Sequence, residues 1–323
     1  MKQKMYIIGA LILLFAVVTF MIKDLFFTNP VNKNPYEFNM NALRKGDTSQ
    51  AMYVESQQIR PAFAEIHGIA TDASGNIYIS GKDSMEIVDT SGKVESIRAI
   101  GGTARCIHVD HNGNILLGME DHVEILDPKG AVKSKWESPG ADAVITSIAT
   151  SGTDIFVADA GNKIVYRYDY SGKLLNKIGQ KDPSSGVPGF IVPSPYFDLA
   201  MGPDGNLWVV NPGRHQLEKY DKDGKLLTSW SHASMDVKGF CGCCNPSNIA
   251  ILPGGALVTS EKAIERVKIY DLQGNFICLV ALPSSFEEGT KGLDLAIGLH
   301  NEILVLDPVK NLVRKFTEKK KQS

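Results

Sequence analysis

The sequence repeats itself, and this repetition is the feature that most constrains its fold. Between His67 and the C-terminus, a unit recurs six times: an apolar segment, a turn centred on Gly or Asn, a second apolar segment and an Asp-x-x-Gly-Lys-like hairpin. The units begin HGIATDASGNIYIS, RCIHVDHNGNILLG, TSIATSGTDIFVAD, FDLAMGPDGNLWVV, SNIAILPGGALVTS and LDLAIGLHNEILVL. Such a period indicates similar structural modules that stack on one another.

Within each unit, the apolar residues fall in runs of four to six, a length typical of strands rather than helices. In the third unit, residues 155–158 and 164–168 are the expected strands, and residues 171–173 form a hairpin into a strand at 174–178. With one further strand, each unit contains four short antiparallel strands, and such a sheet buries its faces only against neighbouring copies. The sequence therefore predicts a β-propeller.

The spacing of the units supports this prediction. Successive turn positions are separated by 38, 39, 53, 50 and 46 residues, inside or just above the range for propeller blades. The last unit lacks a fourth strand, and residues 51–56 are predicted to supply it, which removes an exposed sheet edge. We therefore expect an all-β fold, a six-bladed propeller over residues 51–317, followed by a charged tail at residues 318–323.

The repeats resemble those of the NHL-repeat family of propellers. The match consists of IVYRYD at residues 164–169 with Gly172 and Lys173, preceded by VAD at 157–159 and by Asn162, and weaker copies cover most of residues 52–316. This resemblance implies the fold. It does not choose a function, because the family includes lyases, RNA-binding modules and scaffolds.

One activity of that family can be tested on the residues. The resemblance implies that peptidyl-amidating lyases hold a metal with histidines that open the inner strands, and His67 occupies such a position. A single imidazole does not make that site, so the lyase assignment fails. The equivalent positions in the other units are Arg105, Thr146, Phe197, Ser247 and Leu293.

Charge and linear motifs exclude other classes of function. The net charge of −2 gives no positive field that would attract nucleic acid, so no nucleic-acid partner is expected. The chain also lacks the G-x-S-x-G, H-E-x-x-H and phosphate-cradling Gly-Lys-Ser/Thr motifs of common hydrolases, metalloproteases and nucleotide-binding proteins.

The N-terminus predicts a membrane anchor. The stretch from Met5 to Ile22 has no charged residue and is preceded by Lys2 and Lys4, which favours a single transmembrane helix within residues 1–27. The alternative is a cleaved signal peptide, but the stretch ends without a small-residue cleavage site. Residues 28–50 are predicted to be a linker. The expected location is the cell membrane, single-pass, with the propeller on the extracytoplasmic side and an envelope protein as partner.

Three long insertions, at residues 180–195, 231–246 and 282–292, are predicted to cross between blades on the same rim. Long loops on one rim of a rigid scaffold favour a binding site there, and the alternative is that they are tolerated surface insertions. The second insertion contains Cys241, Cys243 and Cys244. Three interpretations stay open: a disulfide with Cys278, a redox-active dithiol, or a soft metal such as copper, zinc or an iron-sulfur centre with His232 or His215 as a nitrogen donor.

The remaining candidates lie beside these insertions. Second-to-third strand loops of the fourth and fifth units provide Arg214, His215, Glu261 and Lys262, and equivalent inner-strand positions provide Asp198, Asn248 and Asp294. We therefore expect a binding or scaffold module for a protein or small ligand at the insertion-bearing rim. The alternative is a metal-dependent or redox-associated enzyme that uses the Cys241–Cys244 loop.

Overall fold

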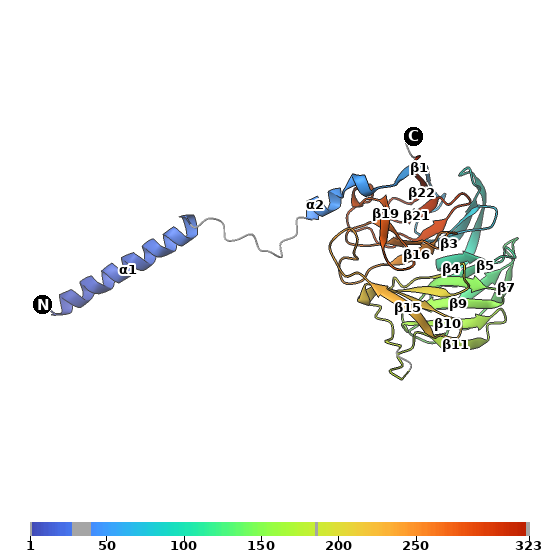
Figure 1. Ribbon diagram of the computed structural model, residues 1–323, viewed down its shortest axis with the longest axis horizontal. Coiled ribbons are helices and arrows are strands. Elements are labelled where there is room, and N and C mark those ends of the chain that lie inside the picture. The colour runs from blue at the N-terminus through green and yellow to red at the C-terminus, as the bar shows by residue number, and fades with distance from the viewer. Residues whose placement is uncertain (1, 28–39, 185–186, 321–323) are drawn as a thin grey trace. The chain divides into compact units, whose positions relative to one another are not determined.

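The computed structural model describes residues 2–27, 40–184 and 187–320 (Figure 1). The chain divides into two compact units, Met1–Ala42 and Leu43–Ser323. Helix α1, Lys2–Phe27, belongs to the first unit, and α2, Met40–Lys45, is followed by a short 3-10 helix, Thr48–Gln50. Residues 28–39 of the predicted linker lie outside the described residues.

The predicted span from Met5 to Ile22 finds no support in the structure. Within the described residues, no helix is both long enough and apolar enough to cross a bilayer.

The described part of the second unit is built from antiparallel sheets. Its strands form five sheets, four with four strands each and one with six. The strands are β1 (Tyr53–Ile59), β2 (Ile66–Thr71), β3 (Ile77–Val88), β4 (Val94–Val109), β5 (Ile115–Met119), β6 (Val123–Leu126), β7 (Val132–Lys135), β8 (Ile145–Ser151), β9 (Asp154–Asp159), β10 (Ile164–Asp169), β11 (Leu174–Ile178), β12 (Leu199–Met201), β13 (Leu207–Asn211), β14 (Gln216–Tyr220), β15 (Leu226–Ser231), β16 (Asn248–Ile251), β17 (Leu257–Ser260), β18 (Val267–Tyr270), β19 (Phe276–Ala281), β20 (Leu295–Ile297), β21 (Ile303–Asp307) and β22 (Leu312–Glu318).

The sheet that joins the two ends of the propeller confirms the predicted closure. Strand β1 pairs antiparallel with β22 in the order β1-β22-β21-β20, with Tyr53 opposite Glu318 and Ile59 opposite Val313. The two strands lie side by side in Figure 1. An early segment thus completes the last sheet and covers the edge of β22.

The predicted count of six separate four-stranded blades is not confirmed, because the first two repeats share one six-stranded sheet, β2-β3-β4-β5-β6-β7. The reason lies in β3 and β4. Strand β3 pairs with β2 up to Gly81 and with β4 from Lys82 onward, and it runs through Lys82 and Asp83, where the repeat predicts a loop between the second and third strands. Strand β4 likewise continues from its pairing with β3 into its pairing with β5. Both strands therefore belong to one continuous sheet.

The outer hairpins explain the recurrent Asp-x-x-Gly-Lys pattern. Oδ1 of Asp169 accepts hydrogen bonds from the backbone N–H groups of Ser171 (2.9 Å) and Lys173 (3.1 Å). Gly172 between them has φ +83°, a left-handed conformation that glycine adopts without steric cost. The same aspartate-centred turn occurs at Asp89, Asp127, Asp221 and Asp271.

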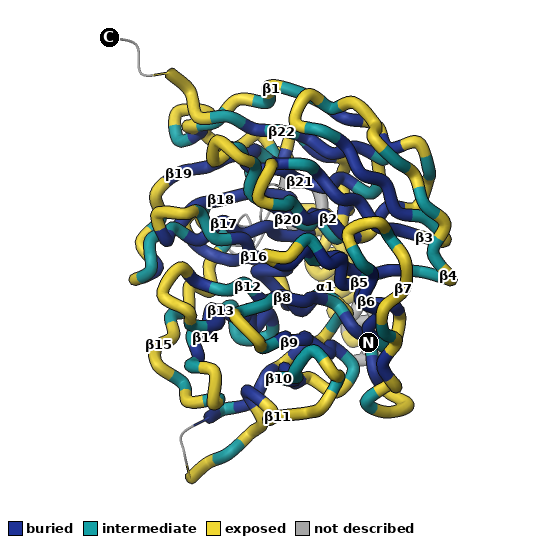
Figure 2. The backbone as a smooth tube through the Cα atoms, turned by 90° about the vertical axis from the view of Figure 1, so that its right-hand side faces the viewer, coloured by how far each residue is buried: buried dark blue, intermediate teal, exposed yellow. Residues whose placement is uncertain are grey.

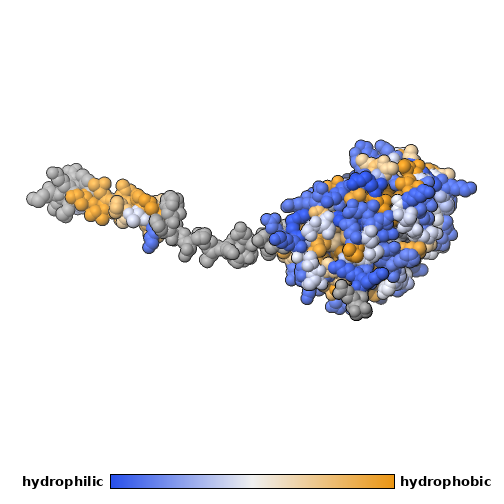
Figure 3. Space-filling model, turned by 90° about the horizontal axis from the view of Figure 1, so that it is seen from above, coloured by the Kyte–Doolittle hydropathy of each residue, from blue (hydrophilic) through white to orange (hydrophobic). Residues whose placement is uncertain are grey.

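The core lies between the sheets, where large side chains of neighbouring repeats meet. Phe156, Trp208, Tyr220, Phe240 and Tyr270 are almost fully buried and belong to one apolar cluster. Figure 2 follows this pattern along the backbone, with buried middle strands and exposed outer hairpins. Polar side chains cover much of the propeller face seen in Figure 3. The sheets thus stabilise one another through contact between neighbouring repeats, as expected for a propeller.

Candidate functional site

The inner strands enclose a central cavity of about 240 Å³. Segments of β2, β4, β8, β12, β16 and β20 line it, one from each of the six sequence repeats. A second cavity of about 300 Å³, which we call the mouth cavity, shares Thr146 and Asp294 with the central one. The two cavities therefore lie next to each other along the middle of the propeller.

Two of the predicted inner-strand residues, Asp198 and Asp294, line the central cavity. Oδ2 of Asp198 accepts a hydrogen bond from the backbone N–H of Ile249 (2.7 Å), and Oδ2 of Asp294 accepts one from Ile69 (2.9 Å). The third, Asn248, donates from Nδ2 to Oδ1 of Asp294 at 3.3 Å. Each bond joins inner strands of different repeats, so these polar side chains connect the wall of the cavity.

The cavity also changes the acidity of its side chains. Burial raises the pKa of Asp198 to about 6 against the opposing effect of its hydrogen bonds. Burial, together with the charge of Asp198, raises the pKa of Asp294 to about 7. Burial lowers the pKa of His108 to about 4, and its Nε2 lies 3.0 Å from Oγ1 of Thr150. The cavity therefore disfavours charge of either sign.

The mouth cavity collects polar groups from several elements. His67 comes from β2 and Arg105 from β4, while Tyr196 and Lys291 come from the segments that precede β12 and β20. Asn248, at the start of β16, adds an amide. Tyr196 directly follows one long insertion and Lys291 lies within another, so this cavity opens at the insertion-bearing rim. Such a concave site with a few convergent polar groups is the usual form of a ligand pocket.

Positive charge predominates among the ionisable groups of the mouth cavity. Arg105 and Lys291 are cations, and burial and then the neighbouring Arg105 lower the pKa of His67. Nη2 of Arg105 lies 3.7 Å from Oε1 of Glu120, a contact between partly exposed side chains. Its Nε is buried and has no hydrogen-bond partner among the described residues. Arg105 therefore keeps an unused donor.

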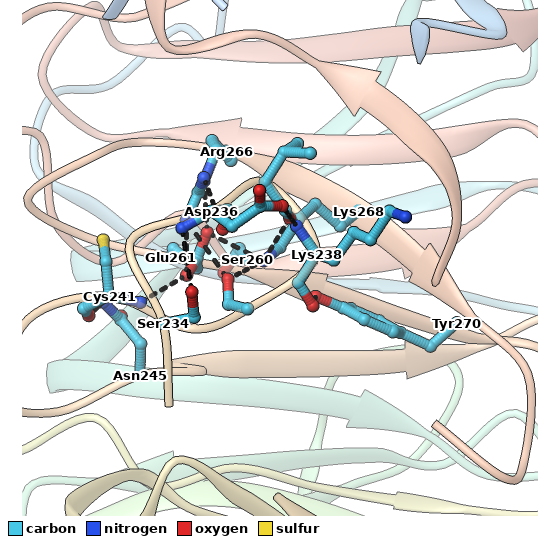
Figure 4. Close-up of polar contacts among 12 residues, drawn as sticks. Ser234, Asp236, Lys238, Cys241, Asn245, Ser260, Glu261, Arg266, Lys268 and Tyr270 are labelled. Carbon is cyan, nitrogen blue, oxygen red and sulfur yellow. Dashed lines mark hydrogen bonds and ion pairs between the residues drawn. The ribbon is translucent and has the colours of Figure 1, made fainter. Parts of the chain in front are cut away.

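Beside the mouth, the second insertion is fastened to the fifth repeat by one buried carboxylate (Figure 4). Glu261, directly after β17, accepts from Nε of Arg266 at 2.6 Å and lies 3.1 Å from Nζ of Lys268. Its Oε1 also accepts from the backbone N–H of Cys241 at 3.1 Å. The side chains of Glu261 and Lys268 have no exposed surface. Glu261, a predicted ligand-binding residue, is thus occupied within the protein.

The two cations complete this attachment. Nζ of Lys268 donates to the carbonyl of Gly239 at 2.6 Å, and Nη2 of Arg266 donates to the same carbonyl at 3.2 Å. Burial lowers the pKa of Lys268 to about 8, although Glu261 opposes this shift. Asn245 adds a further clamp, since its Nδ2 donates to the carbonyl of Cys241 at 2.6 Å. The insertion is therefore held by side chains rather than by regular secondary structure.

The sulfurs of this insertion differ in their surroundings. Cys241 is buried, and burial raises its pKa to about 11. The sulfurs of Cys243 and Cys244 lie 3.1 Å apart. Burial raises the pKa of Cys244, but hydrogen bonds with Lys262, Cys243 and Ser194 outweigh this and leave it below its ordinary value. Cys244 is therefore the most readily ionised thiol of the three.

The two histidines predicted as nitrogen donors for the cysteine loop, and the predicted ligand-binding residue Arg214, contact backbone carbonyls. His215 and His232 each donate from Nε2 to a backbone carbonyl, that of Gly242 at 2.6 Å and that of Gly274 at 2.9 Å. Nη2 of Arg214 lies 3.5 Å from the carbonyl of Pro188. These three residues hold loops in place.

All five cysteines of the chain carry free thiols in the structure. Cys278 is buried in β19, opposite Ile269. Within the described residues, no group of three or more His, Cys, Asp or Glu side chains is arranged to hold a metal ion. The disulfide and the soft metal stay predictions.

Sequence reasoning selected Asn248 and Asp294 among the residues of the mouth cavity, but not its cations Arg105 and Lys291. His67, Arg105, Thr146 and Phe197 occupy equivalent positions at the openings of the inner strands, and all four line the cavity. The repeat alignment contains this signal, although only one of the four residues is a histidine. Tyr196 and Lys291 lie beside or within insertions and have no counterpart in the repeat.

Comparison with known proteins identifies the fold. No protein-family model matches the chain, and no curated protein matches it. A streptogramin B lyase structure is 13% identical over 83% of this chain and 98% of its own, with a TM-score of 0.58. Virginiamycin B lyase from Staphylococcus aureus is 14% identical over 83% of this chain and 100% of its own, with a TM-score of 0.56. The WD40 propeller domain of Doa1 is 15% identical over 79% of each chain, with a TM-score of 0.56. These likenesses, all at low identity, define the chain as a β-propeller.

Proposed function

We propose that this propeller is a binding module for a small anionic ligand that occupies the mouth cavity. The observation that carries the proposal is the convergence of Arg105 and Lys291 on a cavity of about 300 Å³. This volume is at the lower end of the range for small-molecule pockets. The ligand class therefore follows from the size and the charge of the cavity.

The individual side chains of the cavity fit the same ligand. The guanidinium of Arg105 is partly exposed and its contact with Glu120 is 3.7 Å long, so it would donate hydrogen bonds to a carboxylate of the ligand. Asn248 and Tyr196 add an amide and a phenol that fix orientation without charge. Asp294, the one carboxyl group in the lining, has a raised pKa because of its burial, so it opposes an anion less than an ordinary aspartate would.

Succinate and its uncharged analogue succinamide separate charge recognition from simple filling of the cavity. The full chain is titrated with each compound by calorimetry, and its unfolding temperature is recorded. We expect succinate to bind and succinamide not to bind. R105Q should weaken succinate binding about tenfold or more, because a hydrogen bond to a charged group contributes about 1.5–3 kcal/mol.

K129Q is the matched control, since Lys129 is exposed on an outer hairpin and its removal changes the net charge equally. Its affinity for succinate should equal that of the wild type. Equal binding of the two compounds, or wild-type affinity in an R105Q/K291Q double variant, would contradict the proposal.

We also propose that the chain is held at the cell membrane by its N-terminal helix, with the propeller on the extracytoplasmic side and close to an envelope protein partner. The exposed apolar side chains of α1 support this location. Leu13, Leu14 and Phe15 each expose more than half of their surface, at 68%, 61% and 74%. An apolar helix surface of this kind is stabilised by an apolar surrounding. Retention in the membrane pellet after alkaline carbonate extraction, lost in an L13K/L14K variant, tests it.

We propose, finally, that the six-stranded sheet β2–β7 acts as two blades, as in NHL-repeat propellers. The support is that β2 and β4 each contribute a separate segment to the central cavity, like the innermost strands of the other four sheets. A crystal structure tests this assignment. Two blades require that β3 is interrupted by a hairpin turn at Lys82 and Asp83, and that β4 is interrupted near Gly101 and Gly102. A continuous sheet in the crystal would contradict it.

A further inference from the structure

Two neighbouring thiols lie on the second insertion, outside the residues that line the mouth cavity. Cys243 is exposed, whereas Cys244 is buried at 5% exposure. Their sulfurs are 3.1 Å apart. A reagent in solution therefore reaches Cys243, and the sulfur of Cys244 is already within reach of that same atom.

A buried ammonium group stands beside this pair. Lys262 is 8% exposed, its Nζ donates to Oγ of Ser194 at 2.5 Å, and it lies 4.8 Å from the ring centre of Tyr196. No carboxylate of the described residues lies within ion-pair distance of Lys262, whereas the buried Lys268 is paired with Glu261. A buried cation requires a compensating anion. The thiolate of Cys244 meets this requirement.

The other three cysteines lack this combination. Cys106 and Cys278 are buried in apolar clusters. The backbone N–H of Cys241 donates a hydrogen bond to the carboxylate of Glu261, which holds this residue in place. Burial raises the pKa of all three thiols, which keeps them protonated and unreactive. Only the pair Cys243 and Cys244 thus combines a solvent-accessible thiol, an adjacent second sulfur and a neighbouring positive charge.

We propose that Cys243 and Cys244 form a thiol–disulfide exchange site that reduces small-molecule disulfides. The chemistry needs an accessible sulfur for the first bond and a second sulfur close behind it for the next. Cys243 provides the first and Cys244 the second, and Lys262 keeps the pair singly ionised.

The reaction proceeds in two exchanges. In the first, the Cys244 thiolate takes the proton of Cys243, and the Cys243 sulfur attacks a disulfide RSSR to form Cys243–S–S–R and RS⁻. The released RS⁻ then takes the proton from Cys244 and leaves as RSH. In the second, the Cys244 thiolate attacks the sulfur of Cys243, which forms the Cys243–Cys244 disulfide and releases RS⁻. The two protein sulfurs are oxidised by two electrons, and one RSSR is reduced to RSH and RS⁻.

Oxidised glutathione serves as the probe for the full, fully reduced chain. Mass spectrometry of quenched digests should find a Cys243–Cys244 disulfide and the release of two glutathione thiols for each protein. In C244S, the second exchange is impossible, so a glutathione adduct should accumulate on Cys243. K262Q should slow the first exchange about tenfold and shift its pH profile to higher pH, because the positive charge beside the pair is lost.

C278S is the matched control, because it removes a buried thiol outside the site and should leave rate and products unchanged. Folding of each variant is checked by circular dichroism, and K262R, which restores the charge, should recover most of the rate. Three outcomes would overturn the proposal: adducts distributed equally over all cysteines, a K262Q variant with the wild-type rate and pH profile, or reduced protein that holds stoichiometric zinc or copper lost in C243S.

Discussion

The regular sheets and the cysteine-bearing insertion at residues 231–246 are held in place by different forces. In the sheet β8–β11, backbone ladders and apolar side chains such as Phe156 stabilise a fold that every repeat can adopt. The insertion is fastened by one buried carboxylate of the fifth repeat, Glu261. This carboxylate binds Arg266 and Lys268, which in turn hold backbone carbonyls of the insertion. The first arrangement tolerates the change of many residues, because apolar cores accept substitutions of similar volume. The second depends on a few charges.

The largest effect is expected from the removal of Glu261, the carboxylate of the fifth repeat that fastens the insertion. E261A leaves Arg266 and Lys268 buried without their anion, and the free energy of unfolding should fall by about 3–5 kcal/mol. Urea unfolding of the full chain measures this change. E120Q is the control, because the Glu120–Arg105 contact is largely exposed and should contribute less than about 1 kcal/mol. Similar losses in both variants would remove the contrast between the two regions.

The cavity wall and the insertion should respond to pH with opposite signs. The folded-state pKa of Asp294, about 7, lies above its ordinary value of 3.8, so the folded protein binds more protons than the unfolded chain between these values. Its contribution to stability is present below about pH 4 and is lost as the pH rises through 7. The stability difference between wild type and D294N should therefore shrink, or reverse, from pH 4 to pH 7. His108 acts in the opposite direction below pH 6.5 and is common to both proteins.

Lys268 should give the opposite slope at higher pH. Its folded-state pKa of about 8 lies below its ordinary value of 10.5, so the unfolded chain binds more protons between these values. Stability should then increase with pH across this window, and K268M should lack this increase. Chemical unfolding of both proteins at pH 7.5, 8.5 and 9.5 measures the difference. Parallel curves for the two proteins would contradict a buried, easily deprotonated Lys268.

The smallest effect concerns the turns of the regular sheets. In G172A, the new Cβ would lie 2.9 Å from Cδ1 of Trp136, and the residue would have to keep φ +83°. We expect a loss of about 1–2 kcal/mol, measured as a shift of the urea midpoint. Gly254 has open space around it and no positive φ, so G254A should change stability by less than about 0.5 kcal/mol.

The sequence predicted the regular region well because strand period and turn chemistry are local. The expected strands at 155–158 and 164–168 lie within β9 and β10, and the early segment at 51–56 overlaps β1, which pairs with β22. The predicted count of six separate sheets was not confirmed, because continuity across Lys82 and Asp83 depends on the pairing of whole strands rather than on a local pattern. Periodicity alone cannot decide that pairing.

The candidate sites were less predictable, since they depend on which residues meet in space. Arg105 and Lys291 are 186 positions apart in the chain, and only the closed ring brings them to one cavity. The cysteine loop was recognisable by its composition, but not the burial of Glu261 or the approach of Lys262 to Ser194. Both features arise from contacts between different repeats or insertions, and a single sequence carries no signal for such long-range contacts.

The seam between β1 and β22 has a mechanical consequence. Strand β1 is synthesised before every other described strand and its partner β22 after all of them, so the ring closes only after β22 has been made. Tension on the N-terminal segment first reaches the Arg44–Glu265 ion pair, which ties the chain ahead of β1 to the fifth repeat, and then the seam itself. Pulling along β1 stresses its row of backbone hydrogen bonds together. When the chain is stretched from its N-terminus, we therefore expect this one strand to detach first and the remaining sheets to stay intact.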